Sequence, residues 1–237
     1  VNLAASLAYY GKKVLLVDMD PQSSLTTSLG INRSMLYSSI FQVLIGEKTI
    51  EETIVTLDKF KLDVIPATIE LATAEIKITQ EERNFVLYEK LKHLKDRYDY
   101  ILIDSPPSLG LLTLNALYAS DSVLIPVQCQ FLAIDGLTQL LNTIRVVQGN
   151  LKLYNRKFTI EGVLLTMLDR RTKAGWEIVH EIKSYFGEGV FDTIITSNVA
   201  AQVAPTYGVP ILNYKASAPS AKLYKSLAKE IIKNNGR

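Results

Sequence analysis

Runs of aliphatic residues alternate along the chain with segments in which apolar residues recur every three or four positions. Most of the aliphatic runs lack apolar and polar alternation, which is typical of strands buried on both faces of a parallel sheet. The strands predicted from these runs cover residues 13–18, 62–67, 100–104, 122–127, 158–167 and 190–195. Helical periodicity predicts helices over residues 84–98, 133–148, 174–187 and 218–234. The alternation predicts a doubly wound α/β fold with a mostly parallel sheet and helices on both of its faces.

The chain opens on a helical pattern. Leu3 and Leu7, with the alanines that follow each of them, form an apolar stripe that Gly11 ends. No Gly/Ser linker, internal repeat or low-complexity tract interrupts the rest of the chain. We therefore expect a single domain over residues 1–237 that is truncated at its N-terminus.

Composition excludes several classes of protein. The chain has 237 residues, of which 48% are hydrophobic and 21% charged, and its net charge is +2. A single cysteine, Cys129, excludes a disulfide scaffold and a Cys-rich metal site within one chain, and it fits a cytoplasmic protein. No apolar run approaches the roughly 20 residues that span a bilayer. The small positive charge does not by itself indicate a nucleic-acid-binding protein.

Carboxylates follow two of the predicted strands. The stretch DMDPQ places Asp18 and Asp20 at the end of one strand, and IDSPPS places Asp104 at the end of another. A single Asp at a strand end is commonly a turn residue. Two strands that end this way favour a site, because open α/β sheets bind their ligands beyond the carboxyl ends of the strands. Hard oxygen ligands at that edge suit Mg²⁺ shared with phosphate oxygens, which phosphoryl transfer requires.

These segments resemble those of a known family. DMDPQSSLTTSLG (18–30) resembles the switch segment of the ParA/Soj-type partition ATPases, and YDYILIDSPPSLGLLTLNAL (98–117) resembles their Walker B segment. The resemblance continues in the same order through residues 119–137, 161–172 and 204–232. It implies a deviant Walker P-loop ATPase of the MinD/ParA superfamily with ATP/ADP and Mg²⁺ as cofactors. It also implies a homodimer on ATP binding, a ParB-like partner, nonspecific DNA binding, and a role in plasmid or chromosome segregation.

Three aspartates take roles from this resemblance. Asp20 matches the catalytic residue that orients the attacking water. Asp18 matches a position that supports the metal and the bound nucleotide, and Asp104 matches the residue that holds Mg²⁺ through water. A water-orienting carboxylate fits the chemistry, because the transition state mainly requires positioning and charge neutralisation.

Residues farther along the chain match weaker signals of the same family. Asn198 aligns with a segment near the nucleotide base, and a helix cap at the end of a loop is the alternative. Arg171 matches a basic DNA-binding position, with Arg170 and Lys173 beside it, and a solvated surface is the alternative. These basic residues, with Arg145, Lys152, Arg156 and Lys157, are interpreted as one patch that would contact phosphates.

The chain departs from the family in two places. A Gly-rich phosphate loop of the form G-x-x-x-x-G-K-[S/T] is absent from the sequence, and we expect a first strand and this loop to precede Val1 in the natural protein. Ser197 and Ala200 stand where arginines are often found, which weakens the prediction of DNA binding.

Two other functions stay open at this point. One is a non-catalytic interaction module that has lost the phosphate loop. The other is a MinD-like positioning ATPase that associates with the membrane through the basic amphipathic helix at 218–234, although packing of that helix on the sheet is favoured over membrane binding. The expected location is the cytoplasm, with nucleoid association as an open alternative.

Overall fold

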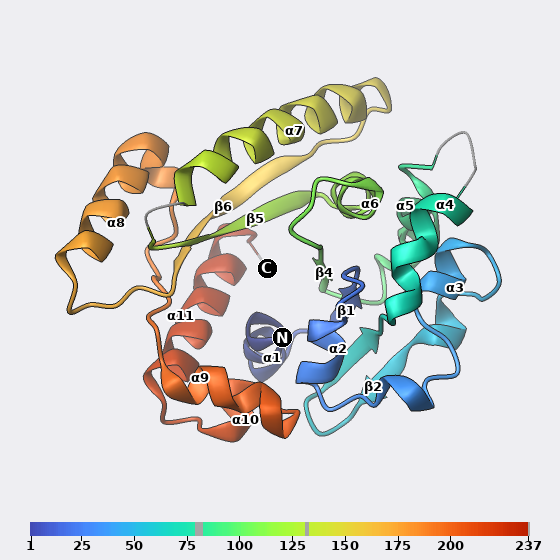
Figure 1. Cartoon of the computed structure of the whole chain (residues 1–237), viewed down its shortest axis with the longest axis horizontal. Coiled ribbons are helices and arrows are strands. Elements are labelled where there is room, and N and C mark those ends of the chain that lie inside the picture. Colours follow the sequence, from blue (N-terminus) through green and yellow to red (C-terminus); the bar gives the residue numbers. More distant parts are fainter. Residues whose placement is uncertain (79–82, 131–132, 237) are drawn as a thin grey trace. The chain divides into compact units, whose positions relative to one another are not determined.

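The computed structural model describes residues 1–78, 83–130 and 133–236 (Figure 1). Its contacts divide the chain into two compact units. Unit 1 comprises Val1–Ser120 and Ala204–Tyr214, and unit 2 comprises Asp121–Val203 and Lys215–Arg237. A single domain over residues 1–237 stays a prediction, and each unit is described here by itself.

Unit 1 contains a mixed sheet of four strands in the order β2-β3-β1-β4. The central strand β1 pairs in parallel with β3 and β4, whereas β2 is an antiparallel edge strand. The register aligns Val14 with Tyr100 and Asp18 with Asp104, so β1 and β4 end at the same level. The mostly parallel sheet that the sequence predicts is confirmed. The strands are β1 (Val14–Asp18), β2 (Val55–Leu57), β3 (Leu62–Ile65) and β4 (Tyr100–Asp104).

Helices cover both faces of this sheet because alternate residues of β1 point to opposite sides and all of its apolar residues are buried. Leu15, Val17 and Ile65 belong to one hydrophobic core with residues of α3, α5 and α6, while α1 contacts β1 and β3. The helices of unit 1 are α1 (Asn2–Tyr9), α2 (Ser24–Ser28), α3 (Ile40–Leu44), α4 (Ala74–Lys77), α5 (Val86–Leu91), α6 (Leu111–Ala119) and α10 (Ile211–Tyr214). Its 3₁₀ turns are η1 (Arg33–Met35), η2 (Glu51–Thr53), η3 (Ile69–Thr73), η4 (Lys92–Leu94) and η6 (Ala204–Tyr207).

Unit 2 is built around two parallel strands, and α7 and α11 lie on opposite sides of them (Figure 1). The last helix buries Leu227 and Ile231, so its apolar face is used for packing within the protein. No helix in the described parts of the chain is long and apolar enough to cross a membrane. The elements are β5 (Ser122–Gln128), β6 (Thr159–Thr166), α7 (Ala133–Leu153), α8 (Lys173–Phe186), η5 (Gly187–Gly189), α9 (Val199–Val203) and α11 (Pro219–Asn234).

The strand predicted over 190–195 is wrong. Val190 and Thr196 form only isolated parallel bridges, and the residues between them follow an irregular path. The backbone N–H groups of Asp192 and Thr193 donate to the carboxylate of Glu230 on α11, at 2.7 and 3.1 Å. Because a side chain takes these two donors, they cannot form a ladder with a neighbouring strand.

Two helices differ in length from the prediction. The pattern at 84–98 forms only α5, which is followed by the 3₁₀ turn η4. The helix predicted over 133–148 continues as α7 to Leu153, where Asn155, with φ of 54°, ends it in the left-handed conformation.

Candidate functional site

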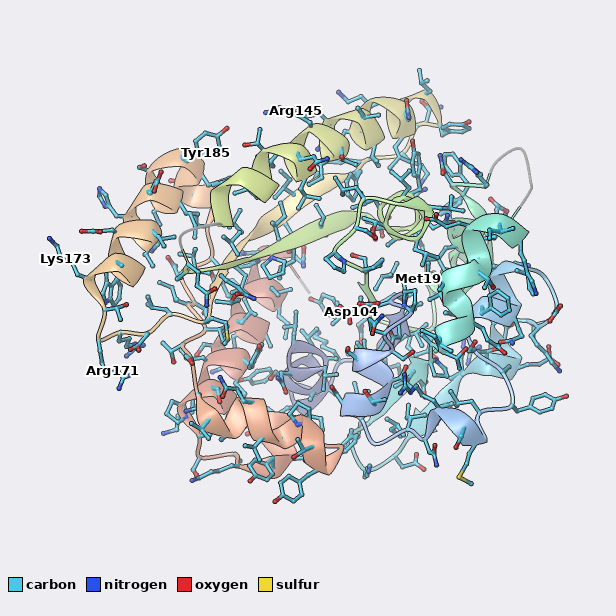
Figure 2. The ribbon with its side chains drawn as sticks, viewed as in Figure 1. Met19, Asp104, Arg145, Arg171, Lys173 and Tyr185 are labelled. Carbon is cyan, nitrogen blue, oxygen red and sulfur yellow. The ribbon has the colours of Figure 1, made fainter. Side chains whose placement is uncertain are left out.

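The three predicted aspartates lie together at the carboxyl ends of β1 and β4 in unit 1, and we call this group of Asp18, Asp20 and Asp104 the carboxylate edge. The backbone N–H of Met19 donates to the backbone oxygen of Asp104 at 2.8 Å, which joins the two strand ends (Figure 2). Asp18 and Asp104 are register partners on adjacent strands. The charge of Asp20 also reaches Asp104, where it helps to raise the pKa of that carboxyl.

Asp18 is completely buried, and its carboxylate accepts three hydrogen bonds. The Oδ1 atom accepts from the backbone N–H of Asp20 at 3.2 Å, while Oδ2 accepts from the N–H and the hydroxyl of Thr26 at 2.9 and 2.6 Å. Burial raises the pKa of Asp18, and the hydrogen bonds from Thr26 oppose that rise. The carboxylate thereby caps the first turn of α2 from outside the helix.

Asp20 lies in the turn between β1 and α2 and is partly exposed. Its Oδ1 atom accepts from the backbone N–H of Gln22 at 2.9 Å, and its backbone oxygen accepts from the N–H of Ser23 at 2.8 Å. Ser23 adopts the left-handed conformation, with φ of 56°, which turns the chain into α2. The side chain is thus held in one orientation at the edge of the sheet by its own backbone.

Asp104 is the exposed member of the carboxylate edge. Among the described residues, no hydrogen bond reaches its carboxylate. The surrounding protein still removes part of its hydration and raises its pKa, an effect that the Asp20 charge reinforces. Asp104 therefore has carboxylate oxygens available for a ligand, whereas those of Asp18 are largely occupied.

The first turn of α1 lies at the same edge, because Val1 is close enough to Asp104 and Asp18 for electrostatic interaction. The first N–H groups of a helix have no partners within the helix, and together with the helix dipole they favour bound phosphate. No group of three or more His, Cys, Asp or Glu in the described residues could hold a metal ion by itself. A Mg²⁺ ion at Asp104 would therefore complete its shell with water and phosphate oxygens, as Mg²⁺ commonly does.

The loop between Asp104 and α6 is held by residues that sequence reasoning missed. The Thr113 hydroxyl donates to the backbone oxygens of Ser108 and Pro106, at 2.6 and 3.2 Å. Glu75 on α4 accepts from the N–H of Leu111, the first residue of α6, at 2.8 Å. Thr113 stands within the Walker B-like segment 98–117, but the resemblance assigned it no role. Glu75 lies outside every motif, and its distance along the chain from Leu111 gives no signal that the two meet.

Asn198 lies in unit 2 and caps α9. Its Oδ1 atom accepts from the backbone N–H of Ala200 at 3.0 Å and from the Ser220 hydroxyl at 3.3 Å. These bonds correspond to the capping alternative for this residue. The contact with a nucleotide base stays a prediction.

The basic residues at the start of α8 are exposed, but two of them have acidic partners. Arg171 donates to the carboxylate of Asp169 through Nε at 2.9 Å and through Nη2 at 2.7 Å, which lowers the pKa of Asp169 to about 2. Lys173 lies 3.6 Å from Glu177 in the next turn of the helix. Arg170 uses its backbone oxygen to accept from the indole N–H of Trp176.

The single basic patch expected from the sequence is wrong, because its members fall into two groups. Arg171 and Lys173 lie at the beginning of α8, whereas Arg145 lies along α7 (Figure 2). The C-terminal end of α7 points away from the beginning of α8 (Figure 1). At the C-terminal end of α7, an open hollow of about 370 Å³ is lined by Gln148, Lys152, Asn155, Arg156, Lys157 and Phe158.

The fold and the carboxylate edge define a protein of the P-loop ATPase class, and solved structures agree. Cobyrinic acid a,c-diamide synthase from Mycobacterium smegmatis, bound to ADP and magnesium, has a TM-score of 0.84 and 31% identity, covering 100% of this chain and 89% of that one. A putative plasmid partition protein from Borrelia burgdorferi B31, bound to AMPPNP, has a TM-score of 0.79 and 25% identity, covering 98% and 91%. The cell division ATPase MinD of Pyrococcus furiosus, 24% identical with a TM-score of 0.78, shares the fold.

Sequence comparison identifies the family. Residues 1–160 match the family model described as AAA domain. Soj of Bacillus subtilis (strain 168), a sporulation initiation inhibitor protein, is 49% identical over 99% of this chain and 92% of its own length. The chromosome-partitioning ATPase Soj of Treponema pallidum is 43% identical over 100% and 92%, and ParA of Myxococcus xanthus is 42% identical over 99% and 82%. The chain therefore belongs to the Soj/ParA family of chromosome-partitioning ATPases.

Proposed function

We propose that this protein is a Mg-ATP-dependent partition ATPase whose nucleotide state controls the formation of a homodimer. The observation that carries the proposal is the carboxylate edge. There, the side chain of Asp20 has a fixed orientation, and Asp104 on the adjacent strand is accessible. The first turn of α1 lies close to the same residues. Two relatives at 42–43% identity, a chromosome-partitioning ATPase and a chromosome partitioning protein, support a role in segregation for this protein.

Each group at the edge has a distinct role in this proposal. The Asp104 carboxylate would hold Mg²⁺ through water, and the ion would supply charge neutralisation for the phosphates. Asp20 orients the attacking water, for which its fixed side-chain orientation suits it. The N-terminus of α1 interacts with the phosphates through its backbone N–H groups. Asp18 supports the site from the interior through its hydrogen bonds with Asp20 and Thr26.

ATP-bound and ADP-bound states differ in the contacts that they make, and this difference would shift the monomer–dimer equilibrium. A ParB-like protein would connect the switch to its cargo. The exposed side chains of Arg170, Arg171 and Lys173 are the proposed contacts to DNA phosphates, and such contacts carry no sequence preference. The ion pair with Asp169 must open for Arg171 to take part.

The test compares the wild-type full-length protein with an Asp20→Ala variant. Calorimetry measures Mg-ATP binding, and phosphate release measures turnover. We expect Asp20→Ala to keep Mg-ATP affinity and to lose about 100-fold or more in turnover, since positioning of the attacking group is removed. Ser24→Ala, an exposed change in the same segment, is the control and should retain full turnover.

Light scattering with and without ATP measures whether the protein forms a homodimer when ATP binds. If Asp20→Ala loses binding together with turnover, Asp20 holds the nucleotide instead of the water. If the wild-type full-length protein binds no Mg-ATP, the proposal is wrong and the non-catalytic interaction module takes its place.

A further inference from the structure

One hydroxyl group connects three segments beneath the carboxylate edge. Thr26 on α2 is completely buried, and its Oγ1 atom lies 2.6 Å from Oδ2 of Asp18 at the end of β1. The same atom lies 3.0 Å from the backbone nitrogen of Ala67, which follows β3. A threonine hydroxyl is therefore the meeting point of β1, α2 and the segment after β3.

The direction of these hydrogen bonds follows from the chemistry of the three groups. The N–H of Ala67 can only donate, so the hydroxyl accepts there. The single hydroxyl proton is then donated to the Asp18 carboxylate. The other oxygen of that carboxylate accepts from the backbone N–H of Asp20 at 3.2 Å. A continuous chain of hydrogen bonds thus runs from Ala67 through Thr26 and Asp18 to the backbone of Asp20.

A neighbouring threonine on the same helix does none of this. The Thr27 hydroxyl is exposed and donates to the backbone oxygens of Ser23 and Ser24, at 3.0 and 3.3 Å, which lie within its own turn. Such a bond is local to the helix and reaches no other segment. The pair therefore provides a matched comparison between a hydroxyl that links segments and one that does not.

We propose that Thr26 is a positioning residue for the hydrolysis site: its hydroxyl holds the Asp18 carboxylate, and that carboxylate fixes the backbone from which Asp20 projects. The inference rests on the proposed function for its catalytic consequence. A role confined to stability would require only that Thr26 fill its buried space. The positioning role requires the hydroxyl itself.

The experiment compares Thr26→Val, which removes the hydroxyl at nearly constant volume, with Thr26→Ser, which keeps it, and with Thr27→Val as the control. In the full-length protein we expect Thr26→Val to lower kcat by about 10- to 100-fold, as small displacements of a catalytic group do. Mg-ATP affinity should stay within about threefold, because the loss is confined to the transition state. Thr26→Ser and Thr27→Val should retain the wild-type kcat.

A second readout is independent of ATP hydrolysis. The amide hydrogen of Asp20 should exchange about tenfold faster or more in Thr26→Val than in the wild type, without nucleotide, and should stay slow in Thr26→Ser. If circular dichroism shows that Thr26→Val does not fold, Thr26→Ala and Thr26→Ser provide the same test, because both lack the methyl group and only one keeps the hydroxyl.

Two results would overturn the inference. One is a Thr26→Val variant with wild-type kcat and wild-type exchange at Asp20. The other is a Thr26→Ser variant in which kcat falls as much as in Thr26→Val, which would assign the effect to the methyl group. A wild-type protein without ATPase activity would contradict the proposed function, and the exchange rates would still decide whether Thr26 positions Asp20.

Discussion

Asp18 in the carboxylate edge of unit 1 and Arg171 just before α8 in unit 2 are charged side chains that differ in burial and in the origin of their partners. Asp18 is completely buried and accepts hydrogen bonds from three different groups. The side chain of Arg171 is 88% exposed, and its partner Asp169 lies only two residues before it in the chain. One charge is fixed by the packing of distant segments, and the other by a neighbour at the surface.

This difference determines what each region can do. A buried carboxylate with fixed partners defines the position of the atoms around it, and its removal leaves unsatisfied donors in the interior. An exposed ion pair contributes little to stability and can exchange its partner for a phosphate group. We therefore expect changes at Asp18 to affect folding and turnover, and changes at the exposed basic residues to affect association alone.

The largest expected effect is a difference in the free energy of unfolding between variants of Asp18 and Asp104, two residues of the carboxylate edge. Asp18→Ala should lower the free energy of unfolding by about 2–4 kcal/mol, because the donors of Thr26 and Asp20 are left without their acceptor. Asp104→Ala should change it by less than about 0.5 kcal/mol, as an exposed side chain does, while abolishing Mg²⁺-dependent ATP binding. Urea denaturation and calorimetry measure the two quantities. Equal destabilisation by both variants would contradict the division of roles between them.

The next effect concerns a close backbone contact within unit 1. Gly208 has φ of 64°, and a Cβ atom there would lie 2.6 Å from Cα of Gly30, just after α2. Gly208→Ala should therefore lose about 2–4 kcal/mol of stability, from the left-handed backbone together with the overlap. Gly46→Ala is the control, with φ of 81° and no atom within 4 Å of the added Cβ, and should lose only about 1–2 kcal/mol. If urea denaturation shows the same loss of stability for Gly208→Ala and Gly46→Ala, the backbone near Gly30 moves away from the added Cβ without cost, and the contact does not matter.

The smallest effect is expected at the surface of unit 2. Arg171→Glu should weaken binding to a nonspecific DNA duplex and reduce the slope of log affinity against log salt by about 1, without moving the urea midpoint. Asp169→Asn should strengthen binding, because it removes the carboxylate that competes with phosphate for Arg171. Fluorescence anisotropy with ATP present provides the affinities. Lys59→Glu, an exposed charge reversal in unit 1, is the control, and an unchanged salt slope in Arg171→Glu would exclude Arg171 from the DNA contacts.

Much of the fold was predictable because it depends on local patterns. The unbroken aliphatic run before Asp18 predicts a strand buried on both faces, and β1 is such a strand. The strand predicted over 190–195 failed because Glu230, far along the chain, takes the backbone donors of that segment. Likewise, the grouping of Arg145 with Arg171 failed because Arg145 lies along α7 and Arg171 lies just before α8, and sequence alone does not place these two elements relative to each other (Figure 2).

By itself, the sequence determined the class of fold, the strand ends that carry carboxylates, and membership of the partition ATPase family, since each depends on residues that are close together in the chain. Only the tertiary structure decided which carboxylate is buried and which is accessible. Asp18 is buried and bonded to Thr26, which in turn bonds to Ala67 after β3, whereas Asp104 on the adjacent strand is exposed. Hydrogen bonds between segments that are distant in sequence leave no periodic pattern, so they become visible only when the chain is folded.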